Sequence, residues 1–258
     1  MRLTTEQLVF IIGVSKNAGD TKMLAVIVNA LGIAVGTVLG VLFRERISQK
    51  LVDALMVAMG LVVIVIGVQS TVGTDNTLCI VLSLAFGAMI GEVLHVDRGL
   101  DGIGDKVRSK LAGKKFAEGR FVEGMITASI LFAVGTMSIL GSIEAGVSKD
   151  YSILFTKTVM DTISSAALTA ALGIGVGFSL IPVFIWEGLI ALLAGILSPL
   201  FSTEVIAAMS AVGGAIFIAM GFNMTNVTDR KINVANLIPA IFIPLIYVPL
   251  ANWISGLL

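Results

Sequence analysis

Long apolar runs, separated by shorter polar stretches, make up most of this chain. Several runs reach the roughly 20 residues that a helix needs to cross the hydrocarbon core of a bilayer. They do not alternate apolar and polar positions, which argues against the strands of a membrane barrel. We therefore expect an all-α, polytopic bundle of transmembrane helices. The eight expected spans are residues 24–43, 51–71, 77–95, 121–143, 152–174, 178–199, 204–225 and 232–255.

Three segments depart from this pattern. Residues 1–22 are mostly polar and predict an N-terminal extension. Residues 98–120 carry apolar side chains at three- and four-residue spacing among charged ones. That spacing predicts an amphipathic connection lying along the cytoplasmic headgroups. The fifth span, residues 152–174, contains charged and hydroxyl side chains, and a broken or re-entrant segment is the alternative there.

The two ends of the chain share a signature of two glycines seven positions apart, followed by an amide. The first copy is Gly60, Gly67 and Gln69, and the second is Gly214, Gly221 and Asn223. Upstream of them, the triplets that begin at Asn29 and Glu187 also correspond. We interpret residues 23–97 and 176–258 as two repeats of three spans each. The two hydroxyl-rich spans within residues 121–175 lie outside the repeat.

The distribution of Lys and Arg residues predicts how the spans are oriented in the membrane. Most of the 17 Lys and Arg residues lie in the connections after the first, third and seventh spans. Because cytoplasmic loops carry an excess of Lys and Arg, we expect these three connections inside and both termini outside. The two repeats, five spans apart, then have opposite orientations in the membrane. Inverted repeats of this kind are typical of secondary transporters, whose substrate sites lie near the midplane.

Composition supports the membrane assignment and argues against other classes of protein. With 57% hydrophobic and 13% charged residues, and a mean hydropathy of +1.02, too little polar surface remains for a soluble domain. A formal net charge of zero gives no reason to expect nucleic acid as a partner. The single Cys79 and single His95 predict neither an internal disulfide nor a metal site. We expect the lipid bilayer as the main partner, no cofactor, and no enzymatic activity, since a nucleophile-elbow motif is absent.

Polar side chains inside the spans are candidates for a solute or ion pathway, because they are costly in hydrocarbon. Glu187 lies near the middle of its span. Lys157 and Asp161 are four residues apart and can pair on one helix face, near the outer end of their helix. Hydrogen bonding between helices is the structural alternative. The candidate set is Asn29, Gln69, Thr136, Ser138, Ser142, Lys157, Asp161, Ser165, Glu187 and Asn223.

Glycines at helical spacing predict close approach between helices, and some of them predict breaks. Gly135 and Gly141 flank hydroxyl residues in the fourth span and permit a break there. Pro239, Pro244 and Pro249 predict a kinked or interrupted last span. The glycines assigned to packing or backbone breaks are Gly32, Gly36, Gly40, Gly60, Gly67, Gly135, Gly141, Gly214 and Gly221.

A family resemblance rests on several of these features together. The run of residues 135–143, the pair Lys157 and Asp161, the glycine-rich stretch 173–176, and Asn29 with its glycine ladder resemble the bacterial family known as domain of unknown function 554, of the YdfK type. The resemblance covers nearly everything from residue 23 onward. It implies a multi-pass protein of the bacterial cytoplasmic membrane, with a suspected transport role and no established substrate.

Two functions remain open from the sequence. The first is a transporter or channel for a small solute or ion, with Asn29, Gln69, Glu187 and Asn223 facing a central pathway. The alternative is a membrane scaffold or sensor without transport activity, whose glycine ladders serve a homodimer. A transporter predicts a polar cavity at mid-membrane that is reached from one side, whereas a scaffold predicts solid packing there.

Overall fold

The computed structural model describes residues 21–44, 46, 48–100, 102, 106, 120–227 and 230–255. These residues form helices and no strand, as predicted. The predicted extension and amphipathic connection lie mostly outside the described residues. The elements are α2 (Thr21–Arg44), α3 (Gln49–Thr71), α4 (Thr77–Val93), α6 (Phe121–Ala133), α7 (Thr136–Val147), α8 (Ser152–Leu172), η2 (Ile174–Ser179), α9 (Leu180–Leu197), α10 (Thr203–Thr225), η3 (Ala235–Phe242) and α11 (Pro244–Ser255).

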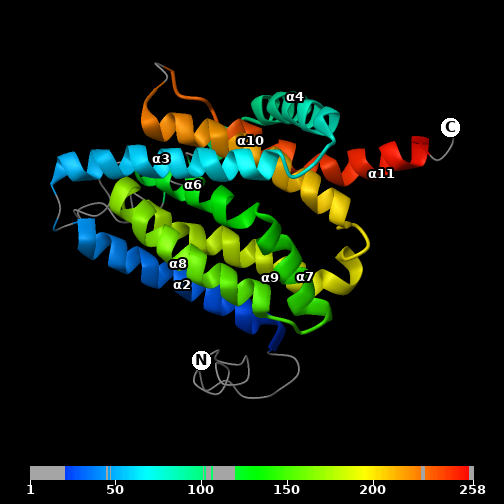
Figure 1. The fold of residues 1–258 in the computed structure, drawn as a ribbon, viewed down its shortest axis with the longest axis horizontal. Coiled ribbons are helices and arrows are strands. Elements are labelled where there is room, and N and C mark those ends of the chain that lie inside the picture. The colour runs from blue at the N-terminus through cyan, green and yellow to red at the C-terminus, as the bar shows by residue number, and fades with distance from the viewer. Residues whose placement is uncertain are drawn as a thin grey trace.

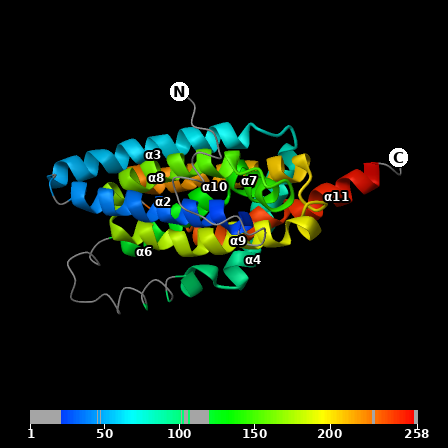
Figure 2. The same cartoon turned by 90° about the horizontal axis from the view of Figure 1, so that it is seen from below.

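Two helix pairs form the body of the bundle. α2 packs along α8, and α3 packs along α10, as the ribbon shows (Figure 1). The helices α7 and α9 pack on each other beside the first pair, while α4 lies against η3. Seen from below, α3 and α4 lie on opposite sides of the bundle and α11 extends away from it (Figure 2).

The contact between α2 and α8 is parallel and is made by small residues. A Cβ on Gly36 would lie 2.2 Å from the Thr162 carbonyl oxygen, and one on Gly40 would lie 2.4 Å from the Ala166 carbonyl oxygen. Only glycine therefore allows the two backbones to come this close. At the end of the pair, Arg44 Nη1 donates to the carbonyl oxygens of Ala170 and Ala171, both at 2.8 Å. This contact satisfies carbonyls in the last turn of α8.

The contact between α3 and α10 is antiparallel, and it pairs the glycines of the repeated signature with one another. A Cβ on Gly60 would lie 3.0 Å from the Gly221 carbonyl oxygen, and one on Gly221 would lie 2.6 Å from the Gly60 carbonyl oxygen. Gly67 and Gly214 show the same reciprocity, at 2.6 and 2.5 Å. The two copies of the signature thus face each other across one helix interface.

Two of the expected spans are interrupted. Gly135 has extended backbone angles between α6 and α7, and the two helices meet at an angle of 56°. The last span consists of the 3-10 helix η3, which contains Pro239, followed by α11, which begins at Pro244 and contains Pro249. Proline cannot donate a backbone hydrogen bond, so both segments depart from a regular α-helix.

Among the described residues, five helices are long and apolar enough to cross a membrane, or six if α6 and α7 form one bent span. The five are Met23–Arg44, Gln49–Thr71, Ile174–Leu197, Thr203–Thr225 and Ala235–Ser255. Two of the expected eight spans do not meet this test. The α4 helix is apolar but has 17 residues, and α8 has 21 residues but carries Lys157, Asp161 and several hydroxyls.

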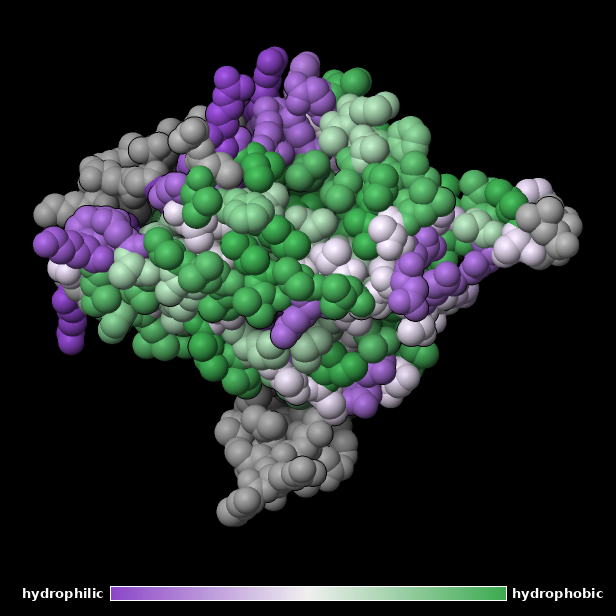
Figure 3. All heavy atoms as spheres, turned by 45° about the horizontal axis from the view of Figure 1, so that its top comes forward, coloured by the Kyte–Doolittle hydropathy of each residue, from purple (hydrophilic) through white to green (hydrophobic). Residues whose placement is uncertain are grey.

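The outward faces of the bundle are apolar. Large hydrophobic side chains are exposed along α2, α3 and α9, for example Leu31, Val65 and Leu189. Hydrophobic residues cover most of the face shown in Figure 3, and hydrophilic ones gather mainly toward its edges. The surface therefore suits contact with lipid, since a soluble monomer rarely exposes apolar patches of this extent.

The reciprocal glycine contact predicts a severe effect of Gly214→Val. The new side chain would meet the Gly67 carbonyl oxygen and the Thr71 backbone nitrogen, at 2.5 and 2.7 Å from the Cβ. Separating α3 from α10 should destabilise the protein by about 1–3 kcal/mol, measured by thermal unfolding in detergent. Gly195→Val on α9 is the matched control, because a Cβ there meets nothing within 4 Å. Equal stability of the two variants would contradict the proposed packing.

Candidate functional site: a buried charge cluster

Four helices bring five polar side chains together inside the bundle. Asn29 comes from α2, Ser138 from α7, Lys157 and Asp161 from adjacent turns of α8, and Glu187 from α9. Asn29, Ser138 and Glu187 are fully buried, while Lys157 and Asp161 are 5% and 6% exposed. We call these five residues the charge cluster. Their burial makes them the most unusual feature of an otherwise apolar interior.

Lys157 lies between the two carboxylates of the charge cluster. Its Nζ is 3.1 Å from Glu187 Oε1, and it also donates to Asp161 Oδ2, one turn along the same helix. Ser138 donates its hydroxyl hydrogen to Glu187 Oε1 at 2.9 Å. These contacts tie α7, α8 and α9 to one point. Lys157 Nζ also lies 5.9 Å from the centre of the Phe132 ring, within reach of a cation–π interaction.

Asn29 bridges the two carboxylates from the other side. Its Nδ2 donates to Asp161 Oδ2 at 3.2 Å and to Glu187 Oε2 at 3.1 Å. Its Oδ1 is buried and has no hydrogen-bond partner. Asn29 and Glu187, which occupy corresponding positions in the two predicted repeats, are thus in direct contact. One amide group remains only half satisfied, which is uncommon in a folded interior.

The electrostatics of the charge cluster are unbalanced. Two carboxylates face one ammonium group, and their low exposure removes most of the solvation that each charge has in water. Taking charged groups out of water costs several kcal/mol per ion, and mutual attraction offsets this only with good geometry. Such a cluster is therefore poor evidence of stabilisation and calls for another explanation.

Lys157 and Asp161 lie in the N-terminal half of α8, which runs from Ser152 to Leu172, and Asp161 is its tenth residue of 21. The helix begins at the residue predicted for the span, and the position of this end on the outer side of the membrane stays a prediction. The sequence also left open whether the two residues pair only with each other. Glu187 in fact joins Lys157, a contact between residues 30 positions apart that helical spacing cannot reveal.

The predicted hydroxyls divide between the charge cluster and helix contacts. Besides Ser138, Ser142 donates to the Ser138 carbonyl oxygen at 2.6 Å within α7. Ser165 donates to the Ile33 carbonyl oxygen at 3.3 Å and so links α8 to α2. Thr136 shares a hydrogen bond of 2.7 Å with Ser210 of α10. The contacts of Ser165 and Thr136 join different helices, as the structural alternative of interhelical hydrogen bonding predicts.

Gln69 and Asn223 do not join the charge cluster. Gln69 lines a cavity of about 430 Å³ near the N-terminal half of α10, together with Thr136, Thr203 and Ser210. Asn223 lies near the C-terminal end of α10 and exchanges two hydrogen bonds of 2.8 Å with the backbone of Ile232. The two amides of the repeated signature therefore lie toward opposite ends of the bundle.

Asn223 is one of the residues that line a second cavity, of about 340 Å³. Its charged lining residues are Asp97, Glu123 and Lys231. Lys231 Nζ is 2.9 Å from Glu123 Oε2, and Asn233 Nδ2 donates to Asp97 Oδ2 at 2.9 Å. The Arg98 backbone N–H and the Asn233 amide hold the pKa of Asp97 below its usual value. This end of the bundle thus carries an ordered group of charges at helix ends and in the connection after α10.

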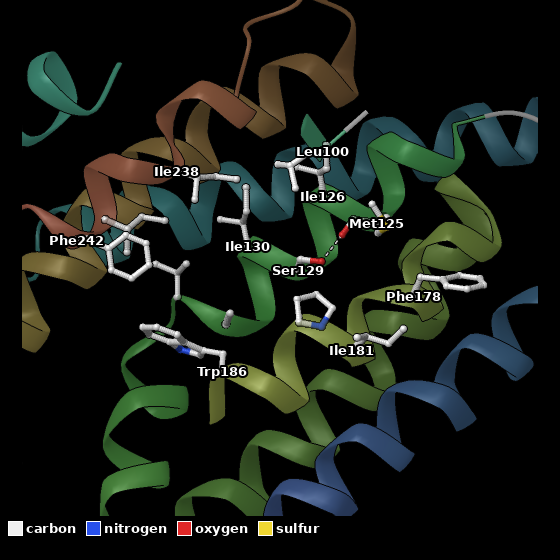
Figure 4. Close-up of a pocket in the computed structure, with 14 residues that line it drawn as sticks. Leu100, Met125, Ile126, Ser129, Ile130, Phe178, Ile181, Trp186, Ile238 and Phe242 are labelled. Atoms are coloured by element: carbon white, nitrogen blue, oxygen red, sulfur yellow. Dashed lines mark hydrogen bonds between the residues drawn. The ribbon is translucent and has the colours of Figure 1, made fainter. Parts of the chain in front are cut away.

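An apolar cavity of about 410 Å³ lies between α6, α9 and η3 (Figure 4). Trp186 and Phe242 meet edge to face at its rim, with ring centres 5.7 Å apart. Ser129 turns its hydroxyl to the Met125 carbonyl oxygen at 2.6 Å, so the cavity wall stays apolar. Sequence reasoning missed this cavity, because its residues read only as parts of apolar spans.

None of the residues of the charge cluster lines these three cavities. Trp186 borders the apolar cavity, whereas Glu187, its neighbour along α9, points into the charge cluster. The charge cluster is closed in this conformation, and none of these three cavities is the polar mid-membrane cavity that a transporter predicted. Within the described part of the chain, no group of three or more His, Cys, Asp or Glu residues could hold a metal ion.

The apolar outer faces and the long helices define a polytopic helical membrane protein. The chain belongs to the family described as protein of unknown function (DUF554), whose family model matches residues 24–249. The resemblance stated from the sequence is therefore confirmed.

Two relatives match over most of their length. The "Uncharacterized membrane protein YdfK" of Bacillus subtilis (strain 168) is 29% identical over 226 residues, covering 86% of this chain and 94% of the relative. The "Uncharacterized protein YqgA" of Escherichia coli (strain K12) is 28% identical over 218 residues, covering 84% of this chain and 92% of the relative. No solved structure matches the chain significantly.

Proposed function

We propose that the protein is a transporter or channel for a small solute or ion, and that its pathway passes through the charge cluster. The observation that carries this proposal is the buried contact of Lys157 with Asp161 and Glu187, bridged by Asn29. Ionisable residues inside membrane spans are expensive, and a substrate, ion or proton pathway is the default hypothesis for them. A catalytic role is not part of the proposal.

An inverted repeat gives this pathway its architecture. The reciprocal contacts of Gly60 with Gly221 and of Gly67 with Gly214 are those expected of two copies related by a two-fold axis. The third spans of the repeats also meet in antiparallel fashion, since Gly87 lies against Ala240. Residues in register meet each other where they lie on the axis itself, and this accounts for the contact of Asn29 with Glu187.

The conformation described here is then an occluded one. In inverted-repeat transporters, one repeat or bundle rocks against the other around a fixed central site. The polar cavities at Gln69 and at Asn223 lie toward opposite ends of α10 and would serve as the two vestibules. Access to the charge cluster requires α7 and α9 to move relative to α2 and α8.

The proposed topology has eight crossings in the bacterial inner membrane. It requires α4 and α8 to cross in addition to the six apolar spans. The polarity of α8 is compatible with crossing because α2, α3, α6 and α7 pack against it, and its exposed side chains include Val159, Met160 and Ile163. Both termini then lie outside and the basic connections lie in the cytoplasm.

The alternative of a scaffold that dimerises through glycine ladders receives less support. Gly32, Gly36 and Gly40 are occupied by α8, and Gly60 and Gly67 by α10, all within one chain. These ladders are therefore not free to bind a second copy. A homodimer would have to use another apolar face.

The pathway predicts that the charge cluster becomes reachable from water. In a Cys79→Ser background, Ser138→Cys is the least disruptive probe, because sulfur replaces an oxygen that faces Glu187. We expect this thiol to react with a small charged methanethiosulfonate reagent in native membranes, and Asn29→Cys should react as well.

Matched variants make that labelling experiment decisive. Ser83→Cys lies on α4, is fully buried and is outside the charge cluster, so it should stay unreactive. Asp75→Cys, in the exposed connection after α3, should react at once. If Ser138→Cys and Asn29→Cys are as inert as Ser83→Cys while Asp75→Cys reacts, the proposed pathway is wrong.

The inverted topology predicts where inserted tags appear. Epitope tags after Lys50 and after Lys231 should both be accessible only from the cytoplasmic side of sealed, oriented vesicles. A tag inserted after Asp75, in the connection between α3 and α4, should be accessible from the outside. A tag after Lys231 on the same side as the one after Asp75 would remove the inverted relationship of the repeats.

A further inference from the structure

We propose that the charge cluster is a proton site, which binds one proton in addition to the ammonium hydrogens of Lys157. The proton resides on the Glu187 carboxyl group and makes the closed charge cluster neutral. This inference rests on the proposed function, because it names the ion that the pathway would take up and release. Three features of the charge cluster support it: its net charge, its burial, and the Asn29 Oδ1 atom that has no hydrogen-bond partner.

The charge count leaves one negative charge in excess. With Lys157, Asp161 and Glu187 all ionised, the charge cluster would carry a net charge of −1 at a place with almost no water contact. An uncompensated buried charge of this kind costs several kcal/mol, and buried groups generally take up or lose a proton instead. One proton on a carboxylate removes the excess charge.

No other described charge compensates it. The helices α2, α3, α6, α7 and η2 pack against α8 or α9. Their other charged residues with described side chains lie near helix ends and are Arg44, Lys50, Asp53, Glu123 and Glu144. Arg44, one of the two cations among them, donates to the carbonyl oxygens of Ala170 and Ala171.

Asn29 offers the acceptor that a protonated carboxyl group needs. Its Nδ2 already donates to both carboxylates, while its fully buried Oδ1 has no partner. A half turn of the amide group exchanges the two atoms at little steric cost. Oδ1 would then lie where Nδ2 lies now and accept the hydrogen of the Glu187 carboxylic acid, while Asp161 would lose the Asn29 donor and keep Lys157 as its partner. An amide that can donate to a carboxylate and accept from a carboxylic acid suits both protonation states.

The ligand chemistry favours a proton over a metal cation. The Lys157 ammonium already occupies the space between the two carboxylates, where a metal ion would have to bind. We place the proton on Glu187 because its carboxyl group joins α9 to Lys157 of α8, whereas Asp161 and Lys157 are paired within α8 itself. Because burial drives the uptake of the proton, the closed charge cluster binds it better than an open, hydrated one would. The proton therefore stabilises the closed state, and its release would favour the movement that opens the charge cluster.

Infrared spectroscopy of the purified protein in lipid vesicles tests this assignment without a substrate. A protonated carboxyl group gives a carbonyl stretching band separate from the backbone amide bands. We expect this band in the wild-type protein at neutral pH. Glu187→Gln and Asp161→Asn should each abolish it, because either change leaves one carboxylate paired with Lys157 and no excess charge. Lys157→Met should increase the band about two-fold, since both carboxyl groups must then be neutral.

Controls separate this site from other carboxyl groups. Glu144→Gln, in the last turn of α7, makes the same chemical change outside the charge cluster and should leave the band intact. Loss of the band on adding sodium would show that a metal cation competes for the site, and would overturn the argument that Lys157 excludes one. A wild-type protein that lacks the band at every pH at which it is folded also overturns the proposal. So does a band that persists in both Glu187→Gln and Asp161→Asn.

The outcome is independent of the transport hypothesis. If the band behaves as expected but Ser138→Cys and Asn29→Cys never react, the proton site stands and the pathway fails. If those thiols react but the band is absent, the pathway stands and the proton assignment fails.

Discussion

The strongest physical constraint on the interior of the bundle is one buried contact, in which the Lys157 ammonium lies between the carboxylates of Asp161 and Glu187. Three helices carry the hydrogen-bonding partners of this contact to the same point, and Asn29 adds a fourth. An apolar interior would pack these helices at less cost, because burying ion pairs seldom gains stability over hydrophobic residues of the same volume. The charges thus make sense as parts of a mechanism and not as a means of holding the fold.

Close backbone contact provides the cohesion that the charge cluster does not. Glycines bring α2 to α8 and α3 to α10 at distances that no other residue permits. In a membrane, where lipid is as apolar as the side chains, such packing is the main attraction between helices. The two kinds of contact therefore have different roles. Small residues hold helix pairs together, and polar residues gather where the pairs meet.

Much of this fold could be predicted from the sequence, since apolar length alone places helices in a membrane protein. The expected spans at residues 51–71 and 204–225 agree within two residues at either end with α3 and α10. Gly135 and the three prolines marked the interruptions, because their backbone restrictions are local. The predicted repeat also placed Asn29 and Glu187 at corresponding positions, although it predicted no contact between them.

Other features were beyond sequence reasoning, because they depend on how helices are rotated about their axes. Gln69 and Asn223 were expected at the centre, yet they lie toward opposite ends of α10. The joining of Lys157 to Glu187 and the apolar cavity beside Trp186 arise only when α8 and α9 pack with their neighbours. The number of spans is another feature that the sequence could not settle. Whether a helix as polar as α8 can cross a membrane depends on the helices that pack against it, and not on its own composition alone.

The most direct measurement of the central claim is the stability of the triple variant Lys157→Met, Asp161→Asn and Glu187→Gln. It removes all three charges while keeping side chains of similar size. If the charges serve a mechanism, the variant should unfold in detergent at a temperature equal to or above that of the wild-type protein. A loss of about 3 kcal/mol or more would contradict the account, because the charge cluster would then be needed for the fold itself.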